Sequence, residues 1–534
     1  MKSRKIGFPE AFAIGVGGMI GGGIFAVLGL SISISKYGAP IAFMVAGLVA
    51  IATGYSYAKL SVRYPSRGGT IEFVVKGFGS GVFSGGLNIL LYLSYTVMIA
   101  LYSFAFGHYA AAAFNAGYPW PQIFSVIVIL AFTSVNALGA YVSGKVEDLL
   151  VYIKLSILLI VAGVGFLYVN YSKLSPGNWP SNINIIAGGM LIFVAYEGFE
   201  LIANASQDVY DHRIIPKALY SSIIVTTLIY IGIAIVSVGV LPLSEVIKAK
   251  DYALAIVAKP VLGSAGFWLV IIGALLSTAS AINATLYGTA GITYLISKIG
   301  YLPSELEKTL WKNASEGLFF IAIMSIILAV YAPLQTISVI GSLGFLTVFT
   351  SVNITAYRLR KEAKANPYIG LVAILLSSFS LGVLIYNQAR SSLGSLLLFL
   401  GVLSGGFLYE YLYRNVTGRR IHEYVDENLE KRIKLIDEWR IWVPPFISEL
   451  KKLTGEAKFY LIGSIARGEK AISHDIDILV VMEKKPSEKK QRILVNNAIN
   501  NAGLTSLHPI HIHFASKEEE EEYKSRSKKY RKLD

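Results

Sequence analysis

The sequence predicts an α-helical polytopic membrane protein that carries a small α/β domain at its C-terminal end. Of its 534 residues, 54% are hydrophobic, and stretches such as 261–296 and 317–330 contain no charged residue. Runs of roughly 20 apolar residues are typical of transmembrane helices. The composition changes near residue 413, because residues 413–534 hold 24 of the 48 basic and 19 of the 34 acidic residues. That segment is long enough for a soluble domain with its own core.

Twelve membrane spans are expected from the apolar runs. They cover approximately residues 10–34, 39–63, 84–114, 120–139, 148–170, 184–208, 215–242, 262–297, 315–332, 335–357, 367–386 and 391–412. With a cytoplasmic N-terminus, the inner segments before the last span hold seventeen Lys and Arg residues and the outer loops hold six. This excess is the bias expected of cytoplasmic loops. The sequence therefore predicts a multi-pass protein of the cell membrane with both termini in the cytoplasm.

A glycine run, "AIGVGGMIGGGIFAVLG" at residues 13–29, lies inside the first predicted span. Close helix packing needs small residues on one face only, whereas Gly21, Gly22 and Gly23 are contiguous. Consecutive glycines weaken a helix locally, and a broken helix is tolerated in a membrane only where its backbone lines a cavity or is buried in protein. Such breaks form the central substrate sites of secondary transporters. We therefore expect the helix to break at Gly21–Gly23, with Gly15, Gly17 and Gly18 allowing close packing.

Four motifs in order resemble the amino acid–polyamine–organocation (APC) transporter superfamily. They are "GVGGMIGGGIF" (15–25), "YPSRGGTIEFVVKGFG" (64–79), "FVAYEGFELIANASQDVYDHRIIPKAL" (193–219) and "ALLSTASAINATLYGTAGITYLISKIGYLP" (274–303). The third motif departs from the family pattern at Asp208, where Glu is usual, and at Asp211-His212, near the usual Asn-Pro. The resemblance implies a LeuT-type fold, with two inverted five-helix repeats plus two further helices, and with spans one and six broken.

The resemblance also implies a substrate site. The N–H groups of Gly21, Gly22 and Gly23 would bind a substrate carboxylate, and carbonyl groups near Ile20 and Phe193–Ala195 would accept its ammonium group. Phe193 or Tyr196 would cover the substrate as a gate. Ordinary core packing is the alternative role for both aromatic residues.

Lys154 is a candidate for proton coupling. "VEDLLVYIKLSILLIVAGV" resembles the fifth span of proton-coupled members of the superfamily, which carry Lys at this position. A protonated Lys154 would bind carbonyl groups near Gly15-Val16 and the hydroxyl groups of Ser277 or Thr278, and deprotonation would loosen these contacts. The alternative is a lysine whose ammonium group reaches the cytoplasmic interface.

The substrate is expected to be a small or medium-sized neutral amino acid. A site for arginine, lysine or polyamines should offer a carboxylate to the distal ammonium group, and the third span contains none. Ionisable residues inside a span are functional candidates by default, so Glu197 and Glu200, three residues apart, are also candidate substrate-binding residues. A potassium or polyamine permease on the same fold remains the alternative. No cofactor is expected for transport.

The C-terminal part is divided into a helical connector at 413–446 and a domain at 447–534, after a transporter domain at 1–412. "TGRRIHEYVDENLEKRIKLIDEWRIW" (417–442) has an apolar stripe at near-helical spacing, and Pro444-Pro445 is expected to stop that helix. The net charge of residues 413–534 is +5, from 24 basic minus 19 acidic residues. No basic-aromatic pattern accompanies this charge, so no nucleic-acid partner is expected, and a surface near anionic lipid headgroups is favoured.

"AKFYLIGSIARGEKAISHDIDILVVMEKK" (457–485) resembles the core motif of nucleotidyltransferases. The matching residues are Gly463, Ser464, Ala466, Arg467, Gly468, Ser473, Asp475 and Asp477, and His474 departs from the usual Ser. Asp475 and Asp477 alternate along a strand, so both carboxylates lie on one face and are suited to hold magnesium on a nucleotide. Gly463, Ser464 and Arg467 are the expected nucleotide-binding residues.

Catalysis by this domain is in doubt. Two-metal phosphoryl transfer in the nucleotidyltransferase family needs a third carboxylate on a later strand, and the strand at 508–515 offers His511 and His513 instead. The histidines bind a different metal, or catalysis is lost, or they are plain strand residues. We expect an inactive domain that binds nucleotide and regulates the transporter, with an active small transferase as the alternative.

Overall fold

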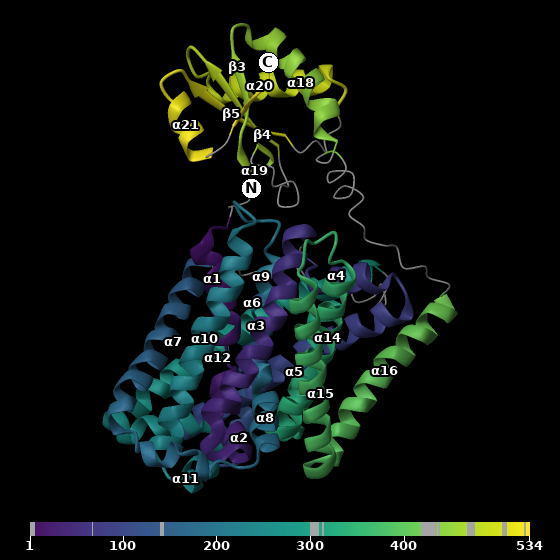
Figure 1. Cartoon of the computed structure of the whole chain (residues 1–534). Helices are drawn as coiled ribbons and strands as arrows, with labels where there is room; N and C mark the ends of the chain where they lie inside the picture. Colours follow the sequence, from purple (N-terminus) through teal and green to yellow (C-terminus); the bar gives the residue numbers. More distant parts are fainter. Residues whose placement is uncertain are drawn as a thin grey trace. The chain divides into compact units, whose positions relative to one another are not determined.

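The structure is a computed structural model that divides into two compact units, Met1–Ile421 and His422–Asp534. It describes residues 6–66, 68–138, 144–299, 309–311, 314–417, 435, 438–466, 476–504, 510–527 and 530–533. Both units contain the expected classes of structure, a helical bundle and a small α/β domain (Figure 1). The predicted fold class is therefore confirmed.

The first unit is built from long apolar helices. Its main helices are α1 (Phe8–Met19), α2 (Gly23–Ser35), α3 (Ala39–Arg63), α4 (Thr70–Phe78), α5 (Val82–Ala113), α6 (Trp120–Ala137), α7 (Gly144–Gly165), α8 (Asn182–Leu191), α9 (Leu201–Asn204), α10 (Ile214–Val240), α11 (Leu243–Lys248), α12 (Ala253–Ile299), α13 (Glu316–Tyr331), α14 (Leu334–Arg358), α15 (Pro367–Ser391) and α16 (Leu393–Thr417). A short strand pair, β1 (Thr309–Trp311) and β2 (Ala314–Ser315), precedes α13.

Each of the twelve predicted spans corresponds to helical structure. Among the described residues, ten helical segments are long and apolar enough to cross a membrane, and one of them, Gly23–Arg63, combines α2 with α3. The sixteen-residue α13 is apolar but shorter than the others. Predicted spans one and six are each divided into separate helices, α1 with α2 and α8 with α9. The first unit is thus an integral membrane bundle with two interrupted helices.

Burial is uneven across the bundle. Helices α5 and α14 are buried along most of their length, and α10 packs against α3 while α12 packs against α5. On α15 and α16 many large apolar side chains are exposed, including Leu371, Leu375, Phe379, Leu397 and Leu398. Exposed apolar surface of this extent marks a site of contact with lipid or protein, which fits helices at the lipid boundary.

The second unit contains a four-stranded sheet with helices on both faces. Its elements are α18 (Trp439–Thr454), β3 (Lys458–Leu461), α19 (Gly463–Ala466), β4 (Ile476–Met482), α20 (Glu488–Asn501), β5 (Ile510–Ser516), α21 (Glu520–Ser527) and β6 (Arg531–Lys532). The strand order is β5-β4-β3-β6; β4 and β5 are parallel, and the other pairs are antiparallel. Because α20 connects the parallel pair, β4, α20 and β5 form a βαβ unit.

Alternation along the strands gives this sheet two different faces. Ile476, Ile478 and Val480 of β4 belong to a core that includes buried residues of α18 and α20, whereas Leu479 and Val481 belong to a smaller cluster against which Tyr523 of α21 packs. Asp477 shares the second face because it alternates with Ile476 and Ile478. The register of β4 therefore sets which side of the sheet carries the candidate metal ligand.

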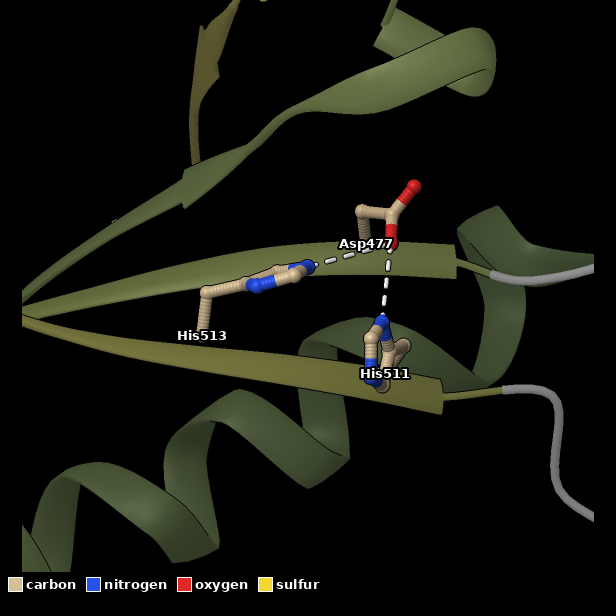
Figure 2. Close-up of side chains that lie close together, drawn as sticks. All are labelled: Asp477, His511 and His513. Carbon is tan, nitrogen blue, oxygen red and sulfur yellow. Dashed lines mark hydrogen bonds and ion pairs between the residues drawn. The ribbon is translucent and has the colours of Figure 1, made fainter. Parts of the chain in front are cut away.

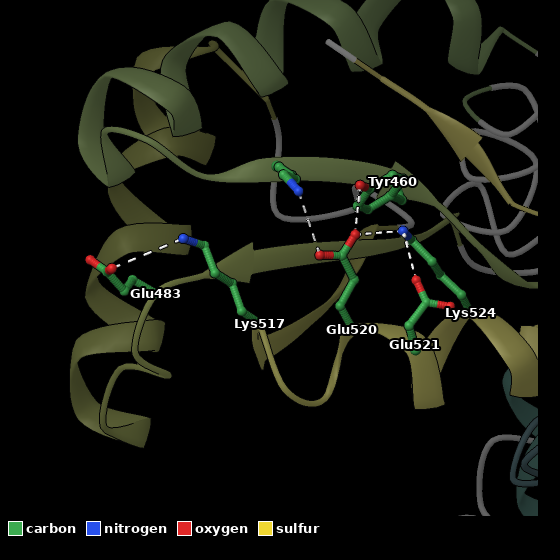
Figure 3. A network of polar contacts seen from close by, with 7 residues as sticks. Tyr460, Glu483, Lys517, Glu520, Glu521 and Lys524 are labelled. Carbon is green, nitrogen blue, oxygen red and sulfur yellow. Dashed lines mark hydrogen bonds and ion pairs between the residues drawn. The ribbon is translucent and has the colours of Figure 1, made fainter.

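A polar network fastens α21 to β3 (Figure 3). The hydroxyl group of Tyr460 donates a hydrogen bond of 2.7 Å to Glu520 Oε1, and the ammonium group of Lys524 also bonds that oxygen. Lys524 Nζ lies 4.3 Å from the centroid of the Tyr460 ring, at cation–π distance. These contacts hold α21 against the face of the sheet that carries Asp477.

The predicted helix stop at Pro444-Pro445 is wrong, because α18 runs through both prolines. The prolines lie in the second turn of the helix, where they remove only the hydrogen bonds that would reach Arg440 and Ile441. Burial of Val443, Phe446, Ile447 and Leu450 along one face of α18 offsets this loss. Most of the predicted connector helix lies outside the described residues, and α16 extends to Thr417.

Replacement of Ile478 by alanine should destabilise the second unit. Ile478 is fully buried in β4, and such a truncation lowers the free energy of unfolding by about 2–5 kcal/mol. Limited proteolysis of the full chain over a urea series should show cleavage within 438–534 at lower urea. The control is Glu483→Ala, since the Glu483 side chain is 87% exposed and forms an ion pair with Lys517 at 4.0 Å (Figure 3). If both substitutions lowered the urea concentration of cleavage equally, the assignment of Ile478 to the core of the second unit would be contradicted.

Candidate functional site

The first helix breaks within the predicted glycine run. Helix α1 ends at Met19 and α2 begins at Gly23. The N–H of Gly21 donates to Gly18 O at 3.0 Å, and the N–H of Ala26 donates to Gly22 O at 3.0 Å. Among the hydrogen bonds of the described residues, none uses the N–H of Gly22 or Gly23. The start of α2 therefore presents the unpaired N–H groups typical of a helix N-terminus.

A second break lies between α8 and α9. After α8, a 3₁₀ turn covers Ile192–Tyr196, and the chain turns at Gly198 before α9 starts at Leu201. Gly198 has φ +116°, a conformation that glycine alone adopts readily. The N–H of Gly198 donates to Glu200 Oε2 at 2.8 Å. The Glu200 carboxylate thus satisfies a backbone N–H group that the broken helix leaves without a carbonyl partner.

The backbones of the two breaks are in contact at glycine residues. A Cβ added to Gly18 would lie 2.7 Å from Gly198 Cα, and one added to Gly23 would lie 2.5 Å from Ala195 Cα. Both separations are too short for any side chain, so the backbones are in direct contact. A Cβ on Gly22 would lie 2.3 Å from the ring of Tyr102 on α5, which covers the break.

Hydroxyl groups satisfy carbonyl groups at both breaks. The hydroxyl group of Tyr230, on α10, lies 2.7 Å from Met19 O and 3.0 Å from Ala195 O, joining the two interrupted helices. Ser277 Oγ, on α12, lies 2.6 Å from both Ile20 O and Gly21 O. Unpaired backbone groups are costly in a bilayer, so these side chains allow the helices to end inside the bundle.

Lys154 reaches the first break from α7. Its side chain is 3% exposed, and Nζ donates to Gly17 O at 2.9 Å. The sequence predicted carbonyl groups near Gly15-Val16 as its partners, so the contact lies one residue further along α1. Gly15 instead packs against Ile202 and Ser222, where an added Cβ would come within 2.6–2.7 Å.

The two predicted hydroxyl partners of Lys154 each donate a hydrogen bond to a backbone carbonyl group. Ser277 Oγ donates to a carbonyl group of the first break, Ile20 O. Thr278 Oγ1 donates to Ala274 O of its own helix at 2.7 Å.

Glu197 and Glu200 are both buried beside tyrosine residues of α5. Tyr102 OH donates to Glu197 Oε2 at 3.2 Å, and Tyr95 OH donates to Glu200 Oε1 at 3.0 Å. The two carboxylates lie within the turn that forms the second break. Their hydrogen bonds fasten that turn to α5.

The two candidate gate residues are packed in the core. Tyr196 is fully buried and donates from its hydroxyl group to Phe43 O at 2.7 Å. Phe193 is fully buried, with its ring 6.0 Å edge-on from that of Phe349. Both residues belong to the 3₁₀ turn Ile192–Tyr196, which includes Ala195, and the backbone of Ala195 contacts Gly23.

Sequence reasoning missed the three tyrosines that contact the breaks, Tyr95, Tyr102 and Tyr230. They lie in apolar spans with no charge or motif to mark them, and tyrosine in a span is common near interfaces. Their burial is the useful signal, since a buried Tyr hydroxyl group needs a partner, and the breaks supply carbonyl and carboxylate acceptors.

The candidate metal site of the second unit lies at the start of β4 and β5. Asp477 pairs with His511 across the parallel strands, and His513 lies two residues further on the same face. His511 Nδ1 and His513 Nε2 each lie 3.3 Å from Asp477 Oδ1 (Figure 2). Arg467 and Asp475 lie outside the described residues, as does the side chain of Ser464.

Gly463 passes directly over the carboxylate of Asp477. With φ +75°, its added Cβ would lie 2.2 Å from Asp477 Oδ2, so only glycine fits. Burial acts to raise the pKa of Asp477, but its hydrogen bonds from His511 and His513 lower that pKa from 3.8 to about 2. The ionised carboxylate thus adds stability above pH 3.8 that is lost as the pH falls toward 2.

The fold and the two interrupted helices define a membrane transporter of the broken-helix class. Residues 6–407 match the amino acid permease family, and residues 444–534 match the nucleotidyltransferase domain family. The chain belongs to the amino acid permease family and carries a C-terminal nucleotidyltransferase domain.

Relatives agree with this assignment. The inner membrane transport protein YbaT of Escherichia coli is 33% identical over 75% of this chain and 94% of its own. The branched-chain amino acid permease BcaP of Bacillus subtilis is 24% identical over 68% of this chain and 82% of its own. A manganese transporter of Eremococcus coleocola has a similar fold, with a TM-score of 0.50 at 12% identity, covering 76% of this chain and 95% of that chain.

Replacement of Tyr230 by phenylalanine should lower the stability of the bundle, because carbonyl groups of both breaks lose their hydroxyl partner. We expect a loss of about 0.5–2 kcal/mol in the free energy of unfolding, measured as a lower thermal midpoint of the purified chain in detergent. Tyr171→Phe is the matched control, since Tyr171 also bonds a carbonyl group, Phe166 O, but is 62% exposed. An unchanged midpoint for Tyr230→Phe would count against the bridging role.

Proposed function

We propose that the bundle is a secondary active transporter that takes up a neutral amino acid together with protons. The observation that carries this proposal is the pair of unpaired N–H groups at Gly22 and Gly23, at the contact between the two breaks. The N-terminus of a helix carries partial positive charge and donates hydrogen bonds to anions. These N–H groups are suited to the carboxylate that every α-amino acid carries.

Carbonyl groups beside the glycines are suited to the substrate ammonium group. Ile20 O accepts from Ser277, but a carbonyl oxygen has two lone pairs and accepts a second hydrogen bond. Phe193–Ala195 are proposed to offer the other carbonyl groups, since Ala195 contacts Gly23. A zwitterion bound here spans the two interrupted helices, so its binding and release would follow their relative motion.

The preference for a neutral side chain rests on where the carboxylates are. Glu197 and Glu200 are held by Tyr102, Tyr95 and the N–H of Gly198, inside the turn of the second break. Helix α5 contains no acidic residue. The Bacillus subtilis relative is named as a permease for branched-chain amino acids, which are neutral, and this supports the same substrate class.

Proton coupling is assigned to Lys154. The protonated ammonium group donates to Gly17 O, one turn before the break. A charged donor makes a stronger hydrogen bond than a neutral amine, so loss of the proton would weaken the contact with Gly17 O. Proton binding would then stabilise the arrangement of α1 that places Gly22 and Gly23 at the contact.

A cation permease is the second candidate function. The paired buried carboxylates of Glu197 and Glu200 favour it, because buried carboxylates attract potassium or a polyamine. Thermal stabilisation by potassium or a polyamine, in place of an amino acid, would distinguish the two functions.

For the second unit we propose a regulatory domain that binds nucleotide at Gly463, Ser464 and Arg467 and does not transfer it. The position expected for a third carboxylate on β5 carries histidine at 511 and 513. We further propose that both termini lie in the cytoplasm, as the distribution of positive charge predicts.

Lys154→Ala should abolish accumulation of amino acid driven by a pH gradient in proteoliposomes, while exchange without a gradient persists. The control is Lys173→Ala, since Lys173 also donates to carbonyl groups, Val240 O at 3.5 Å and Leu241 O at 3.3 Å, but lies away from the breaks. A panel of radiolabelled amino acids identifies the substrate first. Full gradient-driven accumulation by Lys154→Ala would refute the coupling role.

The second unit should bind ATP without turning it over. Incubation of the purified full chain with radiolabelled ATP and magnesium is expected to give saturable retention of label and no covalent product. Transfer of AMP or CMP from the labelled nucleotide to protein, RNA or a small molecule would establish an active transferase instead.

A further inference from the structure

Three metal-ligating side chains converge on one face of the sheet in the second unit (Figure 2). Asp477 comes from β4, and His511 and His513 come from β5. Their ligand atoms all lie within 4.8 Å of one another. The parallel register places Asp477 beside His511, and the period of two places His513 on the same face. All three residues therefore lie on paired strands, and the cluster includes no loop residue.

The two hydrogen bonds to Asp477 are long, and their length equals the spacing of two ligand atoms on one metal ion. Each histidine nitrogen lies 3.3 Å from Asp477 Oδ1, whereas charge-assisted N–H···O bonds are about 2.7–2.9 Å long. Two ligand atoms that each lie about 2.0–2.1 Å from a tetrahedral metal are separated by roughly 3.3–3.4 Å. The cluster thus already has the nitrogen–oxygen spacing of a zinc site.

The donor types select the kind of metal. Imidazole suits zinc, copper, iron and nickel, whereas magnesium prefers oxygen ligands in near-ideal octahedral geometry. Two imidazoles and one carboxylate are three protein ligands, and they leave a fourth position of a tetrahedral ion for water or substrate oxygen. The histidines stand where the family would place a carboxylate, so the preferred ion changes with them.

The surroundings hold the carboxylate and leave the rings accessible. Gly463 lies over Asp477 Oδ2, and the ring of His513 lies 6.1 Å from that of Tyr523 on α21. The side chain of Asp477 is 26% exposed, that of His513 is 29% exposed, and that of His511 is 63% exposed. An ion can therefore reach the cluster from solvent, and the exposed His511 ring can turn toward it.

We propose that Asp477, His511 and His513 form a binding site for a divalent transition metal of the zinc type, in place of the magnesium site of an active nucleotidyltransferase. This site does not depend on whether the domain binds nucleotide, because no nucleotide atom is needed to complete three protein ligands.

The test uses the purified full chain carrying an affinity tag without histidine. Titration with Zn²⁺ should show one saturable site that is retained in about a hundredfold excess of Mg²⁺. Co²⁺ in place of Zn²⁺ should give the strong visible absorption of a tetrahedral site. Absence of saturable Zn²⁺ binding, or displacement of Zn²⁺ by Mg²⁺, would overturn the proposal.

Ligand variants locate the site. His511→Ala and His513→Gln should each weaken Zn²⁺ binding by more than about 100-fold. Loss of a residue that only hydrogen-bonds a metal ligand typically weakens binding by about 10–100-fold, so a larger loss identifies a direct ligand. Glu483→Gln, which removes an exposed carboxylate of the same unit, should bind as the parent chain does. The His511 side chain is 63% exposed, so His511→Ala should lower the thermal midpoint without metal only slightly. Loss of Zn²⁺ binding in this folded variant then reports on the lost ligand. Unchanged binding in both histidine variants would overturn the proposal, whatever the result with ATP.

Discussion

The direct backbone contact between the two interrupted helices is the constraint on which the rest of the bundle depends. Gly18 meets Gly198 and Gly23 meets Ala195 at separations that exclude side chains. A bilayer supplies no water to an unpaired N–H or carbonyl group, so each interruption needs partners from the protein. Tyr230, Ser277 and Lys154 supply them from α10, α12 and α7. These residues leave the N–H groups of Gly22 and Gly23 without a partner among the described residues. The two N–H groups are therefore available to hydrogen-bond a ligand.

Much of this arrangement could be predicted from the sequence because it depends on local chemistry. Three contiguous glycines located the first break, and the apolar runs located the spans. The sequence placed the carbonyl partner of Lys154 near Gly15-Val16, and the structure shows a contact with Gly17 O. Each residue turns a helix by about 100°, so the exact carbonyl depends on how packing rotates α1. The tyrosines at the breaks gave no local signal, since their partners are carbonyl and carboxylate groups of distant segments.

In the second unit, too, some features could be predicted from local sequence and others could not. The sequence placed His511 and His513 on one predicted strand, but only the register between β4 and β5 brings them beside Asp477. Register is a long-range property fixed by packing of both faces of the sheet. The continuation of α18 through Pro444 and Pro445 was likewise unpredictable from local propensity, because the stabilising contacts come from α20 and the sheet.

The claim that the glycine break binds the substrate carboxylate can be tested with a pair of ligands that differ only there. The measurement is the thermal midpoint of the purified chain with the transported amino acid and with its carboxamide, which keeps the ammonium group and side chain. The account predicts a concentration-dependent rise with the amino acid and none with the carboxamide. Equal stabilisation by both would contradict it, because the N–H groups of Gly22 and Gly23 would then have no role in recognition.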